Sequence, residues 1–145
     1  FGDPEAMNTL PILETSFLDV VTAARDGDSL PRLEFAGQAT VCKYAVPDGY
    51  PTDPSAGARI TVDADSVGDA LLFYASVDER ADGLYTTTSR SFAVVGVADS
   101  ITEAEEIAED ALERAGTEGL RVRHDIGKPD LVAQRIDHMD EIRGE

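Results

Sequence analysis

The most constraining feature of the sequence is a short apolar run that leads directly into an amphipathic helix. The run at 91–98 is rich in β-branched residues, which predicts a buried strand. Ser100 and Glu103 follow with the spacing of a capping box, which satisfies free N–H groups of the first helical turn. Apolar residues then recur every three or four positions until Gly116, a residue type that ends helices. The sequence therefore predicts a buried strand covered by a helix at 101–115.

The opposite side of this predicted helix is acidic. Five carboxylates alternate with the apolar positions, so they fall on the side that turns away from the strand. We expect this acidic face to be solvated, because a charge run on a helix is most often exposed to water, and we do not expect it to bind a metal ion. Its members are Glu105, Glu106, Glu109, Asp110 and Glu113.

The whole composition is strongly acidic. The chain has 145 residues, with 29 acidic against 12 basic side chains and a net charge of −17. Such a surface repels nucleic acid and anionic membranes, so we expect neither as a partner. Acidic surfaces with few lysines are typical of halophilic proteins, because high salt screens the self-repulsion. The single cysteine, Cys42, excludes an internal disulfide. With no long apolar run and no signal peptide, we expect a cytoplasmic protein.

Two short helices are predicted before the strands begin. Asp3 is a candidate N-cap with Pro4 at the first helical position, and a second helix is predicted at 16–26. Two helices of this size cannot form a domain by themselves. A polar, irregular segment follows them. We therefore expect a first part at 1–37 and a separate domain at 38–145.

Strand patterns dominate the second part. A strand at 84–88 follows a charged turn at 78–83, and we expect it to form a hairpin with the strand at 91–98. A last helix is predicted to begin at Pro129. This order predicts an α+β fold, namely a small, mostly antiparallel β domain with two covering helices. The other strands are predicted at 39–46, 60–62, 69–77 and 120–126.

Two stretches could contribute to a site. One lies at the start of the chain, and the other lies in the loop before the second predicted strand. Asp3 and Glu5 could bind a metal or a substrate, although an acidic pair is common at the start of a helix. Gly49 frees the loop before Tyr50 and Pro51 to approach a ligand, although a plain surface turn explains the same residues.

A third stretch combines cations and a carboxylate at the end of a predicted strand. Arg123 and Lys128 could hold a phosphate, although a salt-bridged strand end explains them equally well. His124 and Asp125 are adjacent, so on a strand they point to opposite faces, and this disfavours a catalytic pair. No complete catalytic motif is present. Residue chemistry alone therefore defines no active site.

Four short motifs occur in the order and spacing of one protein family. The chain resembles the carboxy-terminal part of glycinamide ribonucleotide synthetase, also called phosphoribosylamine–glycine ligase. The resemblance extends over essentially the whole chain, and four motifs in register make chance a poor explanation. The motifs are Phe1-Gly2-Asp3-Pro4-Glu5, then Gly49-Tyr50-Pro51 with Asp53 and Gly57-x-x-Ile60, then Arg90, and then Arg123-x-Asp125-Ile126-Gly127.

The resemblance implies an ATP-grasp enzyme of de novo purine synthesis. Such an enzyme couples glycine to phosphoribosylamine with ATP and magnesium, through a glycyl phosphate that the sugar amine attacks. Residues 1–37 would be the last helices of the ATP-grasp domain, and 38–145 the β-rich C-terminal domain. The metal ligands would lie upstream of Phe1. We therefore expect no catalytic residue and no metal ligand in this chain, no binding of ATP or magnesium by the chain alone, and no activity of the chain alone.

On this template the expected role of the chain is to help bind anionic substrates. The family usually has glycines where Asp48 and Thr88-Ser89 stand, and a lysine where His124 stands, so the motifs do not match completely. Two alternatives remain, namely a non-catalytic packing or lid module and an independent regulatory domain that binds a metabolite. The candidate substrate-binding residues are Asp3, Glu5, Gly49, Tyr50, Pro51, Arg90, Arg123, Asp125 and Gly127.

Overall fold

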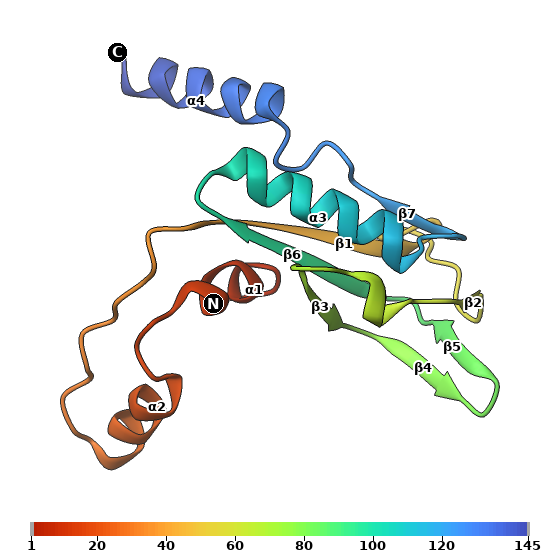
Figure 1. Cartoon of the computed structure of the whole chain (residues 1–145), viewed down its shortest axis with the longest axis horizontal. Coiled ribbons are helices and arrows are strands. Elements are labelled where there is room, and N and C mark those ends of the chain that lie inside the picture. The colour runs from red at the N-terminus through yellow and green to blue at the C-terminus, as the bar shows by residue number, and fades with distance from the viewer. Residues whose placement is uncertain (1, 145) are drawn as a thin grey trace.

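A four-stranded antiparallel sheet forms the centre of the protein (Figure 1). The computed structural model describes residues 2–144, so Phe1 of the first motif lies outside the described residues. The strand order is β3-β6-β1-β7. β1 and β6 pair along seven residues in the middle of the sheet, whereas β7 pairs with β1 over three residues at one edge. The strands are β1 (Ala39–Pro47), β3 (Leu71–Tyr74), β6 (Phe92–Ala98) and β7 (Leu120–Val122).

Helix α3 (Ile101–Ala115) covers one face of this sheet, as the sequence predicts. The Glu103 N–H donates to Ser100 Oγ at 3.2 Å, and the Ser100 hydroxyl donates to the Glu103 carboxylate at 2.9 Å. The helix approaches β6 closely at Gly96, where a Cβ atom would lie 1.9 Å from the backbone oxygen of Ala104. The core between helix and sheet consists mainly of small and β-branched residues. Its fully buried members include Ala45, Phe92, Val94, Ala104, Ala108, Ala111, Leu112 and Ala115.

The acidic side of α3 is not uniformly solvated, contrary to the sequence prediction. Glu105 is 1% exposed, and its carboxylate accepts a hydrogen bond from Lys43 Nζ of β1 at 2.5 Å. Glu109 is partly buried and accepts from the same ammonium at 2.5 Å. The reason is that α3 lies on the sheet with one edge of its acidic face turned towards a buried lysine. Glu106, Asp110 and Glu113 remain exposed.

A second, smaller sheet has the order β2-β5-β4 and lies beyond β3. The hairpin partner of β5 is β4 rather than β6, so the predicted hairpin between 84–88 and 91–98 is wrong. The charged residues at 78–80 belong to a strand rather than to a turn, because this strand lies at the edge of a small sheet, where both faces accept polar side chains. The strands are β2 (Arg59–Ile60), β4 (Val77–Arg80) and β5 (Gly83–Thr86), and a 3₁₀ turn, η2 (Ala64–Ser66), follows β2.

The remaining helices contain no buried residue. Pro4 rather than Asp3 occupies the N-cap position of α1, and Asp3 instead accepts hydrogen bonds from Arg90 and from Tyr44 of β1, so the predicted Asp3 cap is wrong. Figure 1 shows α2 and α4 clear of the sheet, at opposite edges of the view. The expectation of a second covering helix beginning at Pro129 is therefore wrong, and of α2, α3 and α4 only α3 covers the sheet. Among residues 2–144, no helix combines the length and the apolar character that crossing a bilayer requires. These elements are α1 (Glu5–Thr9), η1 (Leu10–Ile12), α2 (Phe17–Asp26) and α4 (Pro129–Arg143).

Candidate functional site

A cavity of about 400 Å³ lies against the sheet face that α3 leaves uncovered. Strand β1 separates this cavity from the core, because its side chains alternate between the two faces. Val41 and Ala45 pack in the core with α3, whereas Cys42, Tyr44 and Val46 line the cavity. A single strand therefore contributes to both the core and the candidate site.

Three arginines line this cavity in a chain that has a strongly negative net charge. Arg90 precedes β6, Arg121 belongs to β7, and Arg123 follows β7. Guanidinium groups bind carboxylates and phosphates with paired, planar hydrogen bonds. The cavity therefore has the chemistry of an anion-binding site. Its lining residues are Pro4, Cys42, Tyr44, Val46, Tyr50, Pro51, Arg90, Arg121, Val122, Arg123 and Ile126.

Arg90 is held by two residues. Its Nη2 donates to Asp3 Oδ2 at 2.8 Å, and its guanidinium lies 4.6 Å from the ring centroid of Tyr44. The Tyr44 hydroxyl also donates to Asp3. Burial and this contact with Asp3 raise the pKa of the Tyr44 hydroxyl above its ordinary value. Tyr44 and Arg90, which are far apart in the sequence, thus form one wall of the cavity, and Asp3 does not line the cavity but holds both of them.

Arg123 pairs with Asp125 through two parallel hydrogen bonds. Nε donates to Oδ1 at 2.6 Å, and Nη2 donates to Oδ2 at 2.5 Å. This pair lowers the pKa of Asp125 to about 2, and both side chains are exposed. β7 ends at Val122, so the predicted strand at 120–126 is too long, and a turn rather than strand alternation brings Arg123 and Asp125 together.

The loop after β1 contributes two residues to the cavity, Tyr50 and Pro51. Gly49 has φ +76°, and a Cβ atom there would lie 2.0 Å from the backbone oxygen of Asp53. The Asp53 N–H also donates to the Gly49 carbonyl at 2.9 Å. Gly49 is therefore required because the backbone of its own loop passes close to it at Asp53. This tight turn sets the position of Tyr50 and Pro51.

The structure brings some of the candidate residues together and leaves others apart. Glu5 is exposed on α1 and does not line the cavity. Gly127 packs against Val41 and Glu105 on the α3 side of the sheet, away from the cavity. Arg121 lines the cavity, although sequence reasoning missed it. The predicted strand at 120–126 would place Arg121 and Arg123 on one face, and this signal could have identified Arg121.

Cys42 lines the same cavity but does not have the properties of a nucleophile. It is 7% exposed, and burial raises the pKa of its thiol to about 11, with a further contribution from the charge of Asp3. The thiolate is the reactive form of cysteine, and this environment disfavours it at neutral pH. Cys42 therefore acts as a small apolar residue of the cavity wall.

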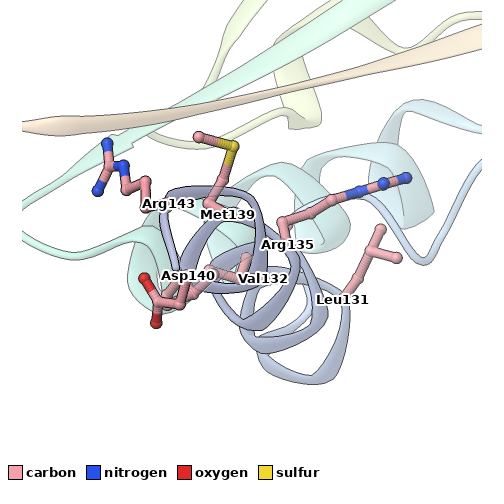
Figure 2. A pocket seen from close by; sticks show the side chains of 8 residues that line it. Leu131, Val132, Arg135, Met139, Asp140 and Arg143 are labelled. Atoms are coloured by element: carbon pink, nitrogen blue, oxygen red, sulfur yellow. The ribbon is translucent and has the colours of Figure 1, made fainter. Parts of the chain in front are cut away.

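A larger hollow of about 510 Å³ runs along α4, but it has no convergent polar groups. Figure 2 shows Arg135, Met139 and Arg143 extending from the helix in diverging directions. Almost all of its lining comes from this one helix. Among the described residues, no group of three or more His, Cys, Asp or Glu side chains is arranged to hold a metal ion. The arginine-lined cavity is therefore the best candidate site in residues 2–144.

The fold and the cavity define an α+β domain that presents arginines beside an antiparallel sheet. The family model described as "Phosphoribosylglycinamide synthetase, C domain" matches residues 40–129. The chain therefore belongs to this family, as the sequence motifs indicate. The family assignment and the α+β fold are both confirmed.

Proteins similar to the chain carry the name phosphoribosylamine–glycine ligase. The chain is 55% identical to the one from Methanococcoides burtonii and 51% identical to the one from Methanocella arvoryzae, in each case over 99% of this chain and 33% of the relative. A crystal structure of the Thermotoga maritima phosphoribosylamine–glycine ligase matches with a TM-score of 0.72 at 27% identity, over 86% of this chain and 31% of that chain. The chain thus spans about a third of the length of these relatives.

Proposed function

We propose that this chain is the C-terminal part of a cytoplasmic, ATP-dependent ligase that joins glycine to 5-phosphoribosylamine in purine biosynthesis. The family match and the names of the relatives support the reaction. The observation that carries the role of this chain is the cavity lined by Arg90, Arg121 and Arg123. In a chain of net charge −17, three arginines around one cavity provide a local attraction for anions.

The substrates of this reaction suit such a cavity. ATP and the ribose phosphate are both anionic, and bidentate arginine contacts orient phosphate oxygens as well as binding them. Arg123 is paired to an exposed carboxylate, so an incoming phosphate can replace Asp125 at small cost. We propose that Arg123 and Arg121 bind the anionic group of a substrate, while Asp3 and Tyr44 keep Arg90 in place.

The complete reaction requires parts that this chain does not supply. Glycine would be activated as glycyl phosphate with release of ADP, and the sugar amine would then form the amide and release phosphate. We propose that magnesium and ATP are bound chiefly by the ATP-grasp portion of the full-length enzyme. Residues 1–37 would be the end of that portion and 38–145 the C-terminal domain. We infer that this chain alone is inactive.

A second function is favoured by one observation. Arg90 and Arg123 both have carboxylate partners within the chain, as the residues of a packing or lid module without substrate contacts would. In that case the arginines only balance neighbouring acids. The two functions predict different results for the same substitution.

The substitution Arg123→Ala in the full-length ligase separates the two functions. If Arg123 stabilises an anionic substrate, kcat/KM should fall on the order of 100- to 1,000-fold, which is typical for loss of one charge-stabilising donor. The melting temperature should barely change, because the pair with Asp125 is exposed. Steady-state kinetics and thermal melts of the same variant give the answer.

Arg80→Ala is the matched control, because Arg80 forms a similar exposed pair with Asp78 and neither residue lines the cavity. It should leave kcat/KM unchanged. Normal turnover of Arg123→Ala together with a lower melting temperature would support the packing module instead.

A further inference from the structure

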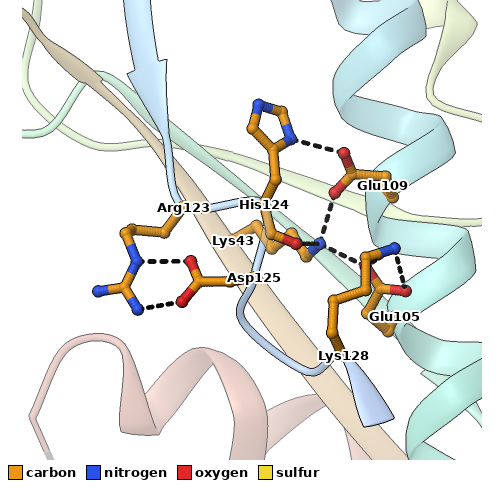
Figure 3. Close-up of polar contacts among 7 residues, drawn as sticks. All are labelled: Lys43, Glu105, Glu109, Arg123, His124, Asp125 and Lys128. Atoms are coloured by element: carbon orange, nitrogen blue, oxygen red, sulfur yellow. Dashed lines mark hydrogen bonds and ion pairs between the residues drawn. The ribbon is translucent and has the colours of Figure 1, made fainter. Parts of the chain in front are cut away.

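On the sheet face covered by α3, an ionic network connects three segments of the chain that are far apart in the sequence (Figure 3). Its centre is Lys43 of β1, which is 0% exposed. Lys43 Nζ donates to Glu105 Oε1 and Glu109 Oε2 of α3, each at 2.5 Å, and to the backbone carbonyl of His124 at 3.0 Å. The buried ammonium therefore joins the central strand, the covering helix and the turn after β7.

The turn after β7 is attached to this network at two more points. His124 Nδ1 lies 2.5 Å from Glu109 Oε1, and Lys128 Nζ donates to Glu105 Oε2 at 2.9 Å. The hydrogen bonds from Lys128 and Lys43 lower the pKa of Glu105 despite its burial, so this carboxylate is ionised and available as an anchor. Both ends of the turn are thus fixed to residues of α3.

The middle of the turn also packs closely against the same elements. Gly127 has φ +84°, and a Cβ atom there would lie 2.9 Å from Val41 Cγ1 and 3.0 Å from Glu105 Cγ. The turn therefore has little freedom to shift towards the helix. Figure 3 shows Arg123 and Asp125 on one side of β1 and the network on the other, so the turn passes around the edge of the sheet.

A buried ionic network of this kind is poorly explained by stability alone. Removing two carboxylates and an ammonium from water is costly, and well-packed apolar residues often stabilise the folded state as much or more. Such networks do select one arrangement of the chain, because their hydrogen bonds are satisfied in only one geometry. The arrangement selected here is the path of the turn that begins at Arg123.

We propose that Lys43 is a positioning residue for Arg123. With Glu105 and Glu109, it holds the backbone at His124 on the helix side of the sheet, and this sets the direction of the Arg123 side chain into the cavity. Lys43 touches no substrate and acts only through Arg123. The inference rests on the proposed function, since it assigns Arg123 to substrate binding.

A double-mutant cycle in the full-length ligase tests this proposal. The first variant is Lys43→Met/Glu105→Leu, which replaces a buried charge pair by apolar side chains of similar size. Its kcat/KM should fall on the order of 10- to 100-fold, as expected when a binding group is displaced by about an ångström. In an Arg123→Ala background the same two changes should have almost no further effect, because the residue through which they act is gone.

Leu112→Ala is the control, because Leu112 is buried in the same helix and makes no polar contact with the turn. Any loss it causes should persist in the Arg123→Ala background. If the Lys43→Met/Glu105→Leu loss also persists there, the network is merely structural and the proposal is overturned. If Lys43→Met/Glu105→Leu does not fold, Lys128→Met removes one attachment of the turn at a half-exposed side chain, and unchanged kcat/KM in that variant overturns the proposal.

The same measurements separate failure of this inference from failure of the proposed function. If Arg123→Ala has normal kcat/KM, the assignment of Arg123 to substrate binding is wrong. If Arg123→Ala is impaired while Lys43→Met/Glu105→Leu retains full kcat/KM, the assignment of Arg123 stands and only the positioning role of Lys43 is overturned.

Discussion

The two faces of the four-stranded sheet use charged residues in opposite ways. On the face covered by α3, Lys43 is inaccessible to water and surrounded by acceptors. On the opposite face, which bears the arginine-lined cavity and is called the open face below, Arg123 is 66% exposed and has one exposed partner. A buried charge must keep its partners, because losing one leaves the others unpaired in a low-dielectric interior. An exposed arginine can exchange its partner at small cost. One face is therefore built for fixed contacts and the other for exchangeable ones.

The largest effect should come from breaking the network on the covered face. Lys43→Ala leaves two carboxylates of α3 near the core without their cation, which should destabilise the chain by about 3–5 kcal/mol. The free energy of unfolding in urea measures this loss. An exposed control, Arg25→Ala, which loses only an exposed pair with Asp26, should stay within about 0.5 kcal/mol of the original chain. If both variants lost the same stability, the contrast between buried and exposed charges would be unfounded.

Acid should weaken the covered face next, and less severely. Burial raises the pKa of Glu105 and Glu109, but hydrogen bonds outweigh it and lower both pKa values, from Lys128 and Lys43 at Glu105 and from Lys43 and His124 at Glu109. A carboxyl group with a lowered folded-state pKa contributes stability above its unfolded value, about 4.3, and loses it as the pH falls through the folded value. Unfolding free energies should therefore drop below about pH 4.3. The drop should be smaller in Lys43→Met/Glu105→Leu, and an equal drop would show that other carboxylates dominate.

A substitution on the open face should have a modest effect on stability. Arg90→Lys keeps the charge beside Asp3 but loses the planar guanidinium that lies over the Tyr44 ring. We expect a loss of about 0.5–1 kcal/mol, the size of a partly exposed cation–π contact. Thermal melts measure it. A loss as large as that of Lys43→Ala would mean that the open face is also built of fixed contacts.

Salt should act on the exposed charges and hardly on the buried network. The net charge of −17 makes the surface repel itself, and ions screen exposed charges far more than buried pairs. We therefore propose a halophilic character, with a melting temperature that rises by about a few degrees between low and molar salt. The same rise should occur in Lys43→Met/Glu105→Leu. A flat or falling melting temperature would contradict this character.

The sequence predicts local structure here better than it predicts contacts between distant segments. The serine N-cap and the apolar period of α3 are local signals, and the structure confirms them, although the Glu103 carboxylate accepts from the Ser100 hydroxyl rather than from a backbone N–H. Burial of Glu105 depends on its contact with Lys43, which lies 62 positions away in the sequence, and no local pattern predicts that contact. The hairpin prediction failed for the related reason that an exposed edge strand has the polar composition of a turn.

In the candidate site, too, residues in local motifs could be predicted and residues placed by long-range contacts could not. The motifs identified Arg90 and Arg123, because each stands in a short stretch that matches the family. Arg121 and Tyr44 were missed, because their part in the cavity follows from strand alternation and from the pairing of β1 with β7 rather than from any motif. The role of Gly127 in packing behind the sheet likewise depends on three-dimensional contacts.

The short pairing of β7 with β1 affects how often the cavity wall opens. β7 holds to β1 through three residue pairs at an edge, whereas β1 and β6 share seven pairs in the centre. Short edge segments open by local fluctuation far more often than central strands, so amide protons of β7 should exchange with solvent sooner than those of β6. Arg121 lies on that strand and Arg123 immediately after it. The lifetime of the assembled cavity is therefore limited by the opening of its outermost strand.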